Sequence, residues 1–132
     1  MRIHQWLKVL AERKGSDLYL ATGAPPCAKF EGELKTISSD ILGPGEVAEI
    51  ANELMDDTQR EDFARDLEMN LAVSLPSVGR FRVNVFRQRN EVSIVARFIV
   101  MDIPQWHDLG LPEILTELII RKRGLILFVG AT

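Results

Sequence analysis

The chain has 132 residues, enough for one ordinary domain with a hydrophobic core. Apolar residues make up 46% and charged residues 27% of it, as in soluble globular proteins, and the formal net charge of −3 argues against bulk binding to nucleic acid or to an anionic membrane. Cys27 is the single cysteine, which excludes an internal disulfide and a zinc site built on cysteines.

The amino-terminal segment carries several charged residues and no continuous apolar stretch, which argues against a signal peptide. No apolar run reaches the length that a membrane-spanning helix needs. We therefore expect a cytoplasmic protein.

The first elements of the chain are a helix, a strand and a hairpin. Apolar residues at helical spacing predict a helix that begins near Ile3 and is stopped by Gly15. The segment SDLYLAT then alternates in polarity, with Asp17 and Tyr19 on one side, which is typical of a strand. A short hairpin is expected over residues 27–37, with its turn at the Glu-Gly pair.

Two further helices are predicted in the middle of the chain. The first has Pro44 near its start and an apolar stripe along one side. The second is expected to begin at Thr58, because Thr58 and Glu61 have the spacing of a capping box. We interpret Asp56 and Asp57 as serving this helix start electrostatically rather than binding a metal. The apolar face of the second helix is expected to consist of Phe63, Ala64 and Leu67.

A long hairpin over residues 79–101 carries the richest pattern in the sequence. Each of its strands has one wholly apolar side, and both apolar sides must face the core. A tight turn at residues 89–90 satisfies this condition. The same register places Arg82 directly opposite Arg97 on the outer side, with Arg80 beside them. The apolar residues that set the register are Phe81, Val83 and Val85 in one strand and Val92, Ile94, Ala96 and Phe98 in the other.

The two facing arginines need an explanation, because like charges directly opposite each other destabilise a sheet by up to about 1 kcal/mol. One interpretation is that carboxylates offset the repulsion, or that the side chains splay into water; the chain has 19 acidic residues. The other is a shared anion, because a pair of guanidinium forks suits phosphate oxygens. The residues alone leave both open. Nucleic acid is disfavoured, because Phe86 is the one aromatic residue on this side of the hairpin.

The carboxy-terminal part differs in character. Residues 102–111 contain proline and glycine without periodicity and are interpreted as a linker. Residues 112–123 predict a helix whose final cations complement its dipole. The unbroken apolar run 125–129 predicts a strand buried on both faces, the kind found in parallel sheets. This order predicts an α+β unit over residues 1–101, followed by the start of an α/β unit.

The chain resembles the type IV pilus retraction ATPases, which belong to the secretion ATPase superfamily. The segments that carry this resemblance follow the order in which the family has them: GSDLYLATGAPPCAKFEGELKTI, GRFRVNVF, ARFI, IPQWHDLGLPEIL and KRGLILFVGAT. Together they cover essentially the whole chain. Tyr19 stands where the family often has histidine and Lys29 where arginine is common, and both departures point toward the PilU branch rather than PilT.

The resemblance implies a PAS-like antiparallel sheet with packed helices over residues 1–101, then the linker, then the first helix and strand of a RecA-like ATPase domain over 112–132. In this family FVGAT continues into a P-loop, so Gly130, Ala131 and Thr132 correspond to the first three positions of that phosphate-binding motif. The resemblance therefore implies an amino-terminal fragment that ends where the nucleotide site begins.

By the same resemblance, the full-length protein is expected to be a hexameric ATPase that powers pilus retraction and twitching motility, with ATP and Mg²⁺ as cofactors. Arg82 and Arg97 match family arginines that reach the nucleotide phosphates, and Arg80 and Arg87 are secondary candidates. We expect no catalytic residue, metal ligand or cofactor in these residues, and no ATP hydrolysis by them alone. The expected partners are further copies of the motor, a related retraction ATPase and the inner-membrane platform protein, with the motor peripheral to that membrane.

Two alternatives remain open at this stage. One is a non-enzymatic PAS-like module that binds a protein or a small ligand and regulates something else. The other is the corresponding part of a pilus-extension or type II secretion ATPase.

Four smaller features complete the expectations from the sequence. His4 and His107 lack a partner at metal-ligand spacing. Trp106 is interpreted as an anchor for the linker. Without a neighbouring sheet, residues 125–129 are expected to be disordered or paired to another copy.

Overall fold

The computed structural model describes residues 1–101 and 104–130 and divides the chain into two units, with the boundary after Met101. The first unit contains helices and an antiparallel sheet, which confirms the predicted α+β class. The PAS-like and RecA-like assignments stay predictions. In chain order the elements are α1 (Ile3–Glu12), β1 (Asp17–Ala21), β2 (Cys27–Phe30), β3 (Glu33–Thr36), α2 (Glu46–Leu54), α3 (Asp57–Asp66), β4 (Glu68–Leu75), β5 (Gly79–Gln88), β6 (Glu91–Ile99) and α4 (Ile114–Leu118).

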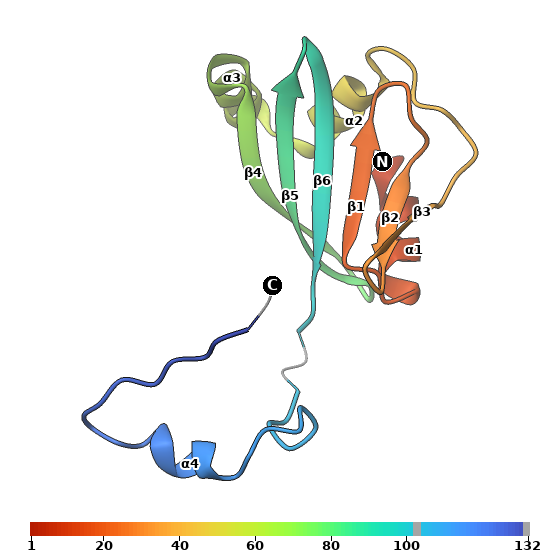
Figure 1. The fold of residues 1–132 in the computed structure, drawn as a ribbon. Coiled ribbons are helices and arrows are strands. Elements are labelled where there is room, and N and C mark those ends of the chain that lie inside the picture. The colour runs from red at the N-terminus through yellow and green to blue at the C-terminus, as the bar shows by residue number, and fades with distance from the viewer. Residues whose placement is uncertain (102–103, 131–132) are drawn as a thin grey trace. The chain divides into compact units, whose positions relative to one another are not determined.

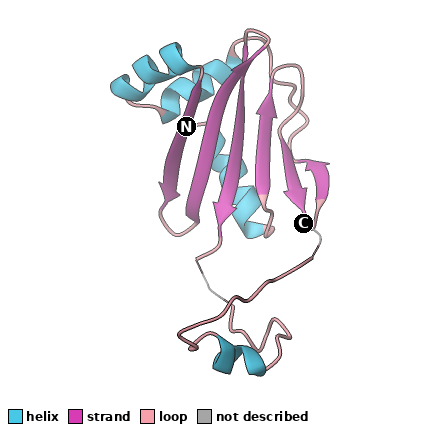
Figure 2. Cartoon of the chain, turned by 60° about the vertical axis from the view of Figure 1, so that its left-hand side comes forward, coloured by secondary structure: helices cyan, strands magenta, loops and turns pink. Residues whose placement is uncertain are grey.

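The sheet of the first unit has six strands in the order β3-β2-β1-β6-β5-β4, and all neighbouring strands are antiparallel. The central pair, β1 and β6, joins the beginning of this unit to its end. Helices α1 and α2 lie behind the sheet in Figure 1, and the turned view in Figure 2 also places them on one side of it. The opposite face, called the outer face below, is covered by no helix of this unit.

The core lies between the sheet and the helices α1 and α2. Alternate residues of β5 and β6 are buried there, as the hairpin pattern predicted, and Phe98 is partly buried with its ring centroid 5.2 Å from that of Phe81. The first helix contributes Ile3, Trp6, Leu7 and Leu10, and α2 contributes Val47, Ile50 and Ala51. Burial of these apolar side chains fixes which face of each strand points inward.

The predicted register of the β5–β6 hairpin is confirmed. Gln88 pairs with Glu91, and Arg82 pairs with Arg97. The two turn residues, Arg89 and Asn90, have φ angles of 51° and 67°, the left-handed conformations that a type I′ turn requires. This turn matches the right-handed twist of the strands, so it holds the register along the whole hairpin.

Helix α3 is capped by Asp56 and not by the predicted Thr58. Asp56 is the N-cap: its Oδ1 accepts a hydrogen bond from the Gln59 backbone N–H at 2.8 Å, and Gln59 Oε1 accepts one from the Asp56 N–H at 3.0 Å. The expected box of Thr58 and Glu61 is wrong, because Thr58 already lies inside the helix. The sequence offers two boxes two residues apart, and the aspartate forms the one observed.

The expected apolar face of α3 is also only partly correct. Phe63 is buried, but Ala64 and Leu67 are exposed. The helix contacts the sheet at its edge strand, β4, so a single turn of α3 reaches apolar neighbours. Leu67 instead ends the helix in the left-handed conformation, with φ 60°.

The second unit contains one short helix among its described residues. Only Ile114–Leu118 of the expected helix over 112–123 is α-helical. Residues 125–129 form no strand, and Val129 is 93% exposed. A strand buried on both faces needs neighbours in a sheet, and the described residues provide none for this run. No described helix has the length and apolar character to cross a membrane.

Gly15 takes part in both helix termination and packing, because its backbone N–H donates to the Leu10 carbonyl oxygen at 2.8 Å and closes the end of α1. The helix ends at Glu12, and the left-handed residue after it is Lys14, with φ 53°. A Cβ at Gly15 would lie 2.6 Å from Leu10 Cδ1 and 2.8 Å from Phe30 Cε1, both buried side chains. The glycine therefore lets α1 and β2 approach each other in the core.

We expect Gly15→Ala to lower the free energy of unfolding by about 1–3 kcal/mol, because the added methyl group overpacks the core. Urea unfolding followed by circular dichroism measures this change. Gly43→Ala is the milder control, since its Cβ would come no closer than 3.3 Å to another residue, at Glu46 Oε2, and its effect should stay within about 0.5 kcal/mol. Equal unfolding midpoints for the two variants would show that Gly15 has room for a side chain.

Candidate functional site

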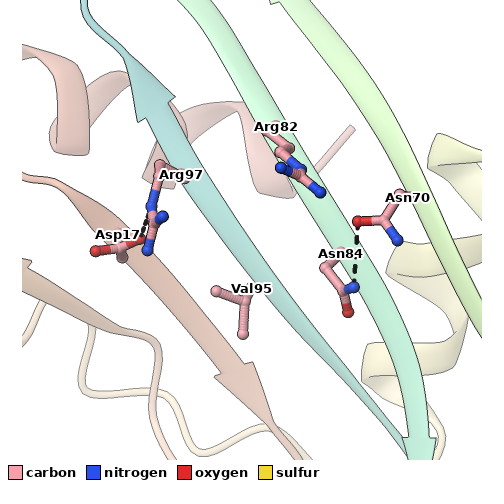
Figure 3. A pocket seen from close by; sticks show the side chains of 6 residues that line it. All are labelled: Asp17, Asn70, Arg82, Asn84, Val95 and Arg97. Atoms are coloured by element: carbon pink, nitrogen blue, oxygen red, sulfur yellow. Dashed lines mark hydrogen bonds and ion pairs between the residues drawn. The ribbon is translucent and has the colours of Figure 1, made fainter. Parts of the chain in front are cut away.

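The outer face carries the two arginines that the sequence singled out. Burial alternates along β5 and β6, and Arg82 and Arg97 occupy exposed positions between buried or partly buried ones. They are direct partners in the register of the hairpin. A shallow hollow of about 300 Å³ lies over them, called the arginine hollow below (Figure 3), and it is lined by Asp17, Asn70, Arg82, Asn84, Val95 and Arg97.

Arg97 is held by a carboxylate from the neighbouring strand. Asp17 of β1 is its partner in the β1–β6 register, and Asp17 Oδ1 accepts a hydrogen bond from Arg97 Nε at 2.8 Å. Asp17 is 5% exposed, whereas the Arg97 side chain is 71% exposed. The hydrogen bond raises the pKa of Arg97 above its usual value, so Arg97 keeps its positive charge throughout the working pH range.

Arg82 has no such counter-ion: within residues 1–101 and 104–130, no acidic side chain forms an ion pair with it. Each of the two interpretations from the sequence, an offsetting carboxylate and a shared anion, is therefore partly supported. A carboxylate offsets the charge of one arginine, and the other presents an uncompensated charge at the outer face. The hollow thus has a net positive character suited to an anion.

The wall of the hollow on the β4 side is formed by polar side chains that bond to one another. Asn84 Nδ2 donates to Glu68 Oε1 at 2.9 Å and to Asn70 Oδ1 at 3.3 Å; the second bond is drawn in Figure 3. Asn70 and Asn84 are also partners in the β4–β5 register. These bonds occupy Glu68 with amide groups, which is consistent with its making no ion pair with Arg82 among the described residues.

The secondary candidates lie outside the arginine hollow. Arg80 is on the outer face, one step along β5 and opposite Ile99. Arg87 lies near the turn of the hairpin, opposite the buried Val92. Because side chains alternate along a strand, Arg87 belongs to the side that faces the core and not to the outer face. Neither Arg80 nor Arg87 lines the hollow over the facing pair.

Of the three positions expected to begin a P-loop, the structure describes Gly130. Gly130 belongs to the second unit and is exposed. Ala131 and Thr132 lie outside the described residues. Their assignment to a nucleotide stays a prediction.

The sequence interpretation missed the contribution of Asp17, Asn70 and Asn84. Alternation had placed Asp17 and Tyr19 together on the polar side of the first strand, and the structure puts that side on the outer face. What the sequence did not reveal is that β1 lies next to β6. Once that neighbour is known, Asp17 falls directly opposite Arg97.

The described residues provide no alternative metal centre. Among residues 1–101 and 104–130, no group of three or more His, Cys, Asp or Glu side chains could hold a metal ion. His107 stacks on Trp106, with ring centroids 4.0 Å apart. Cys27 is half-buried, with its Sγ 3.3 Å from the Pro25 carbonyl oxygen.

Comparison with known sequences identifies relatives along the whole chain. A scan against models of protein families found no match. The chain is 42% identical over all 132 residues to the type IV pilus ATPase PilU of Pseudomonas aeruginosa, and 33% identical over 132 residues to PilT of the same organism. It spans 35% and 38% of the length of these two relatives. The resemblance expected from the sequence is confirmed, and the higher identity to PilU agrees with the interpretation of Tyr19 and Lys29.

Comparison with solved structures agrees. The pilus retraction motor PilT, solved with bound ADP, superposes with a TM-score of 0.72 at 31% identity, over 87% of this chain and 35% of that one. The Legionella pneumophila ATPase DotB superposes with a TM-score of 0.60 at 22% identity, over 93% of this chain and 34% of that one, and shows likeness of fold alone.

Because Arg82 faces Arg97, we expect Arg82→Gln to raise the free energy of unfolding by up to about 1 kcal/mol at low salt. The gain should shrink at high salt, since exposed charges are screened there. Urea unfolding at low and high sodium chloride concentration measures both effects. Arg80→Gln is the control, because its cross-strand partner is Ile99, and it should change stability little. Equal gains for the two variants would mean that the facing pair is not the source of repulsion.

Proposed function

Since the whole chain is similar to the type IV pilus ATPases PilU and PilT, we propose that it forms the amino-terminal part of a pilus retraction motor. In this proposal the complete motor hydrolyses ATP to drive pilus retraction and twitching motility. The outer face of this chain contributes Arg82 and Arg97 to the nucleotide. The observation that carries the proposal is that these two arginines lie side by side and exposed in a chain with this similarity.

The chemistry of the arginine hollow fits a polyphosphate. Guanidinium groups donate forked, charge-assisted hydrogen bonds, and two of them side by side can bridge the oxygens of one phosphate. Arg82 brings a charge without a counter-ion among the described residues, and Arg97 keeps most of its side chain exposed. The solved PilT motor holds ADP, which supports a nucleotide as the ligand.

The arginines act on charge and position rather than on bond breaking. Hydrolysis and phosphate release remove negative charge from the bound nucleotide, which weakens its attraction to the arginine pair. The sheet would then be released from the nucleotide, and this release would couple hydrolysis to movement within the motor. The pair would sense whether a terminal phosphate is present and convert that difference into movement.

The remaining parts of the nucleotide site come from the resemblance. Gly130, Ala131 and Thr132 are proposed to begin the P-loop, whose backbone N–H groups bind phosphate. We assign the ligands of Mg²⁺ to other parts of the motor; the described residues hold no group of three or more His, Cys, Asp or Glu side chains that could bind a metal ion.

Assembly follows the same reasoning. We propose a hexameric ring in the cytoplasm, peripheral to the inner membrane, that works with a related retraction ATPase and the membrane platform protein of the pilus machine. A non-enzymatic PAS-like module is the outcome if the complete protein neither binds nor hydrolyses ATP.

In the complete motor, Arg82→Ala and Arg97→Ala should each weaken ATP binding by about 10- to 150-fold, the loss expected for a charge-assisted hydrogen bond of about 1.5–3 kcal/mol. ADP binding should weaken less, because ADP lacks the terminal phosphate. Titration with each nucleotide and steady-state ATP turnover measure these changes. The 132-residue chain alone should show no turnover above background.

Arg80→Ala is the matched control, since Arg80 lies on the same face but outside the arginine hollow. It should weaken ATP binding much less than Arg82→Ala or Arg97→Ala does. If neither Arg82→Ala nor Arg97→Ala alters ATP affinity or turnover, the proposed role of the pair is wrong.

A further inference from the structure

Asp17 is a buried charged residue on an otherwise exposed patch. It is 5% exposed, although its strand partners on both sides, Lys29 of β2 and Arg97 of β6, carry long charged side chains. Burying a carboxylate is costly unless it is paired and hydrogen-bonded. Asp17 forms its hydrogen-bonded ion pair with Arg97, and this pair offsets the cost of burying the carboxylate. Both residues line the arginine hollow.

The hydrogen bond uses one particular donor of Arg97. Asp17 accepts from Nε, the nitrogen nearest the aliphatic stem, and not from the two terminal nitrogens. In the described part of the chain, those terminal nitrogens make no hydrogen bond. A guanidinium group held at Nε has a fixed plane, and its terminal nitrogens remain available to a ligand.

The same contact limits the repulsion between the arginines. Arg82 and Arg97 are directly opposite each other, where like charges disfavour close approach. The carboxylate of Asp17 lies on the far side of Arg97 from Arg82, because the register runs β1, β6, β5 (Figure 3). Arg97 is therefore attracted away from Arg82 and held there, which leaves room over the pair for an anion.

We propose that Asp17 is a positioning residue for phosphate binding: it holds Arg97 by Nε so that the terminal nitrogens of Arg97 and the guanidinium of Arg82 are presented together to a nucleotide phosphate. The inference rests on the proposed function, since the phosphate is that of the motor's nucleotide. It adds that the arginine pair is oriented before the nucleotide arrives. Pre-orientation lowers the entropy lost when the phosphate binds.

A double-mutant cycle in the complete motor tests this role. Asp17→Ala alone is expected to weaken ATP binding or turnover by about three- to tenfold, the coupling typical of contacting residues. In the Arg97→Ala background, the same substitution should have no further effect on ATP. In the Arg82→Ala background it should still lower ATP binding, because Arg97 remains to be positioned.

Two further variants separate orientation from charge. Asp17→Asn keeps an acceptor oxygen for Arg97 Nε and should recover part of the loss. Glu33→Ala removes an exposed carboxylate from the edge strand β3 of the same sheet without touching Arg97 or the lining of the hollow, and it should leave ATP binding unchanged.

The outcomes distinguish this inference from the proposed function. If Arg97→Ala lowers ATP binding but Asp17→Ala does not, the positioning role is wrong and the proposed function stands. If Asp17→Ala costs as much in the Arg97→Ala background as in the unaltered protein, Asp17 acts through stability and the positioning role is again wrong. If Arg97→Ala itself has no effect, the proposed function fails first.

A measurement on the unaltered 132-residue chain guards against a variant that fails to fold. In a ¹⁵N–¹H spectrum of arginine side chains, the Nε–H of Arg97 should exchange with water more slowly than that of Arg82, because Asp17 accepts its hydrogen bond. Arg97→Lys assigns the signal by its disappearance. Equal exchange rates for the two arginines would mean that Asp17 does not hold Arg97 in solution.

Discussion

The register between β5 and β6 is the constraint on which the candidate site depends. Because the apolar residues of both strands must face the helices, the alternating polar residues must lie on the outer face. A slip of one residue would expose Phe81 and bury Arg82, which the core cannot tolerate. The cost of burying a charge therefore holds two arginines opposite each other, although they repel. Asp17 on the next strand makes this arrangement stable without filling the space above it.

Local features of this fold could be predicted from the sequence, and long-range pairings could not. The hairpin register followed from alternation and from a two-residue turn, both of which lie within one continuous segment. The neighbourhood of β1 and β6 joins residues 80 positions apart, and no local pattern encodes it. Asp17 was therefore read only as the polar side of a strand. The predicted N-cap of α3 was wrong for a different reason. Two capping-box patterns overlap in this segment, and their sequences alone do not decide which one forms.

The carboxy-terminal run shows the limit of reading hydrophobicity alone. Residues 125–129 are apolar enough for a buried strand, yet they form no strand and are exposed. Strand formation depends on partners that supply hydrogen bonds and apolar contact. An apolar run therefore shows that a segment needs such partners, and does not show that it has them. In the first unit the strands that supply the core meet this requirement, because each of them has a neighbour in the sheet and buried apolar residues on its inner face.

The most direct test of the central claim is a structure of the complete motor with a non-hydrolysable ATP analogue. We expect the outer face to turn toward the nucleotide, with the guanidinium nitrogens of Arg82 and Arg97 within hydrogen-bond distance of the terminal phosphate and Asp17 still bonded to Arg97 Nε. An outer face turned to solvent, or a terminal phosphate held by other residues alone, would contradict the claim.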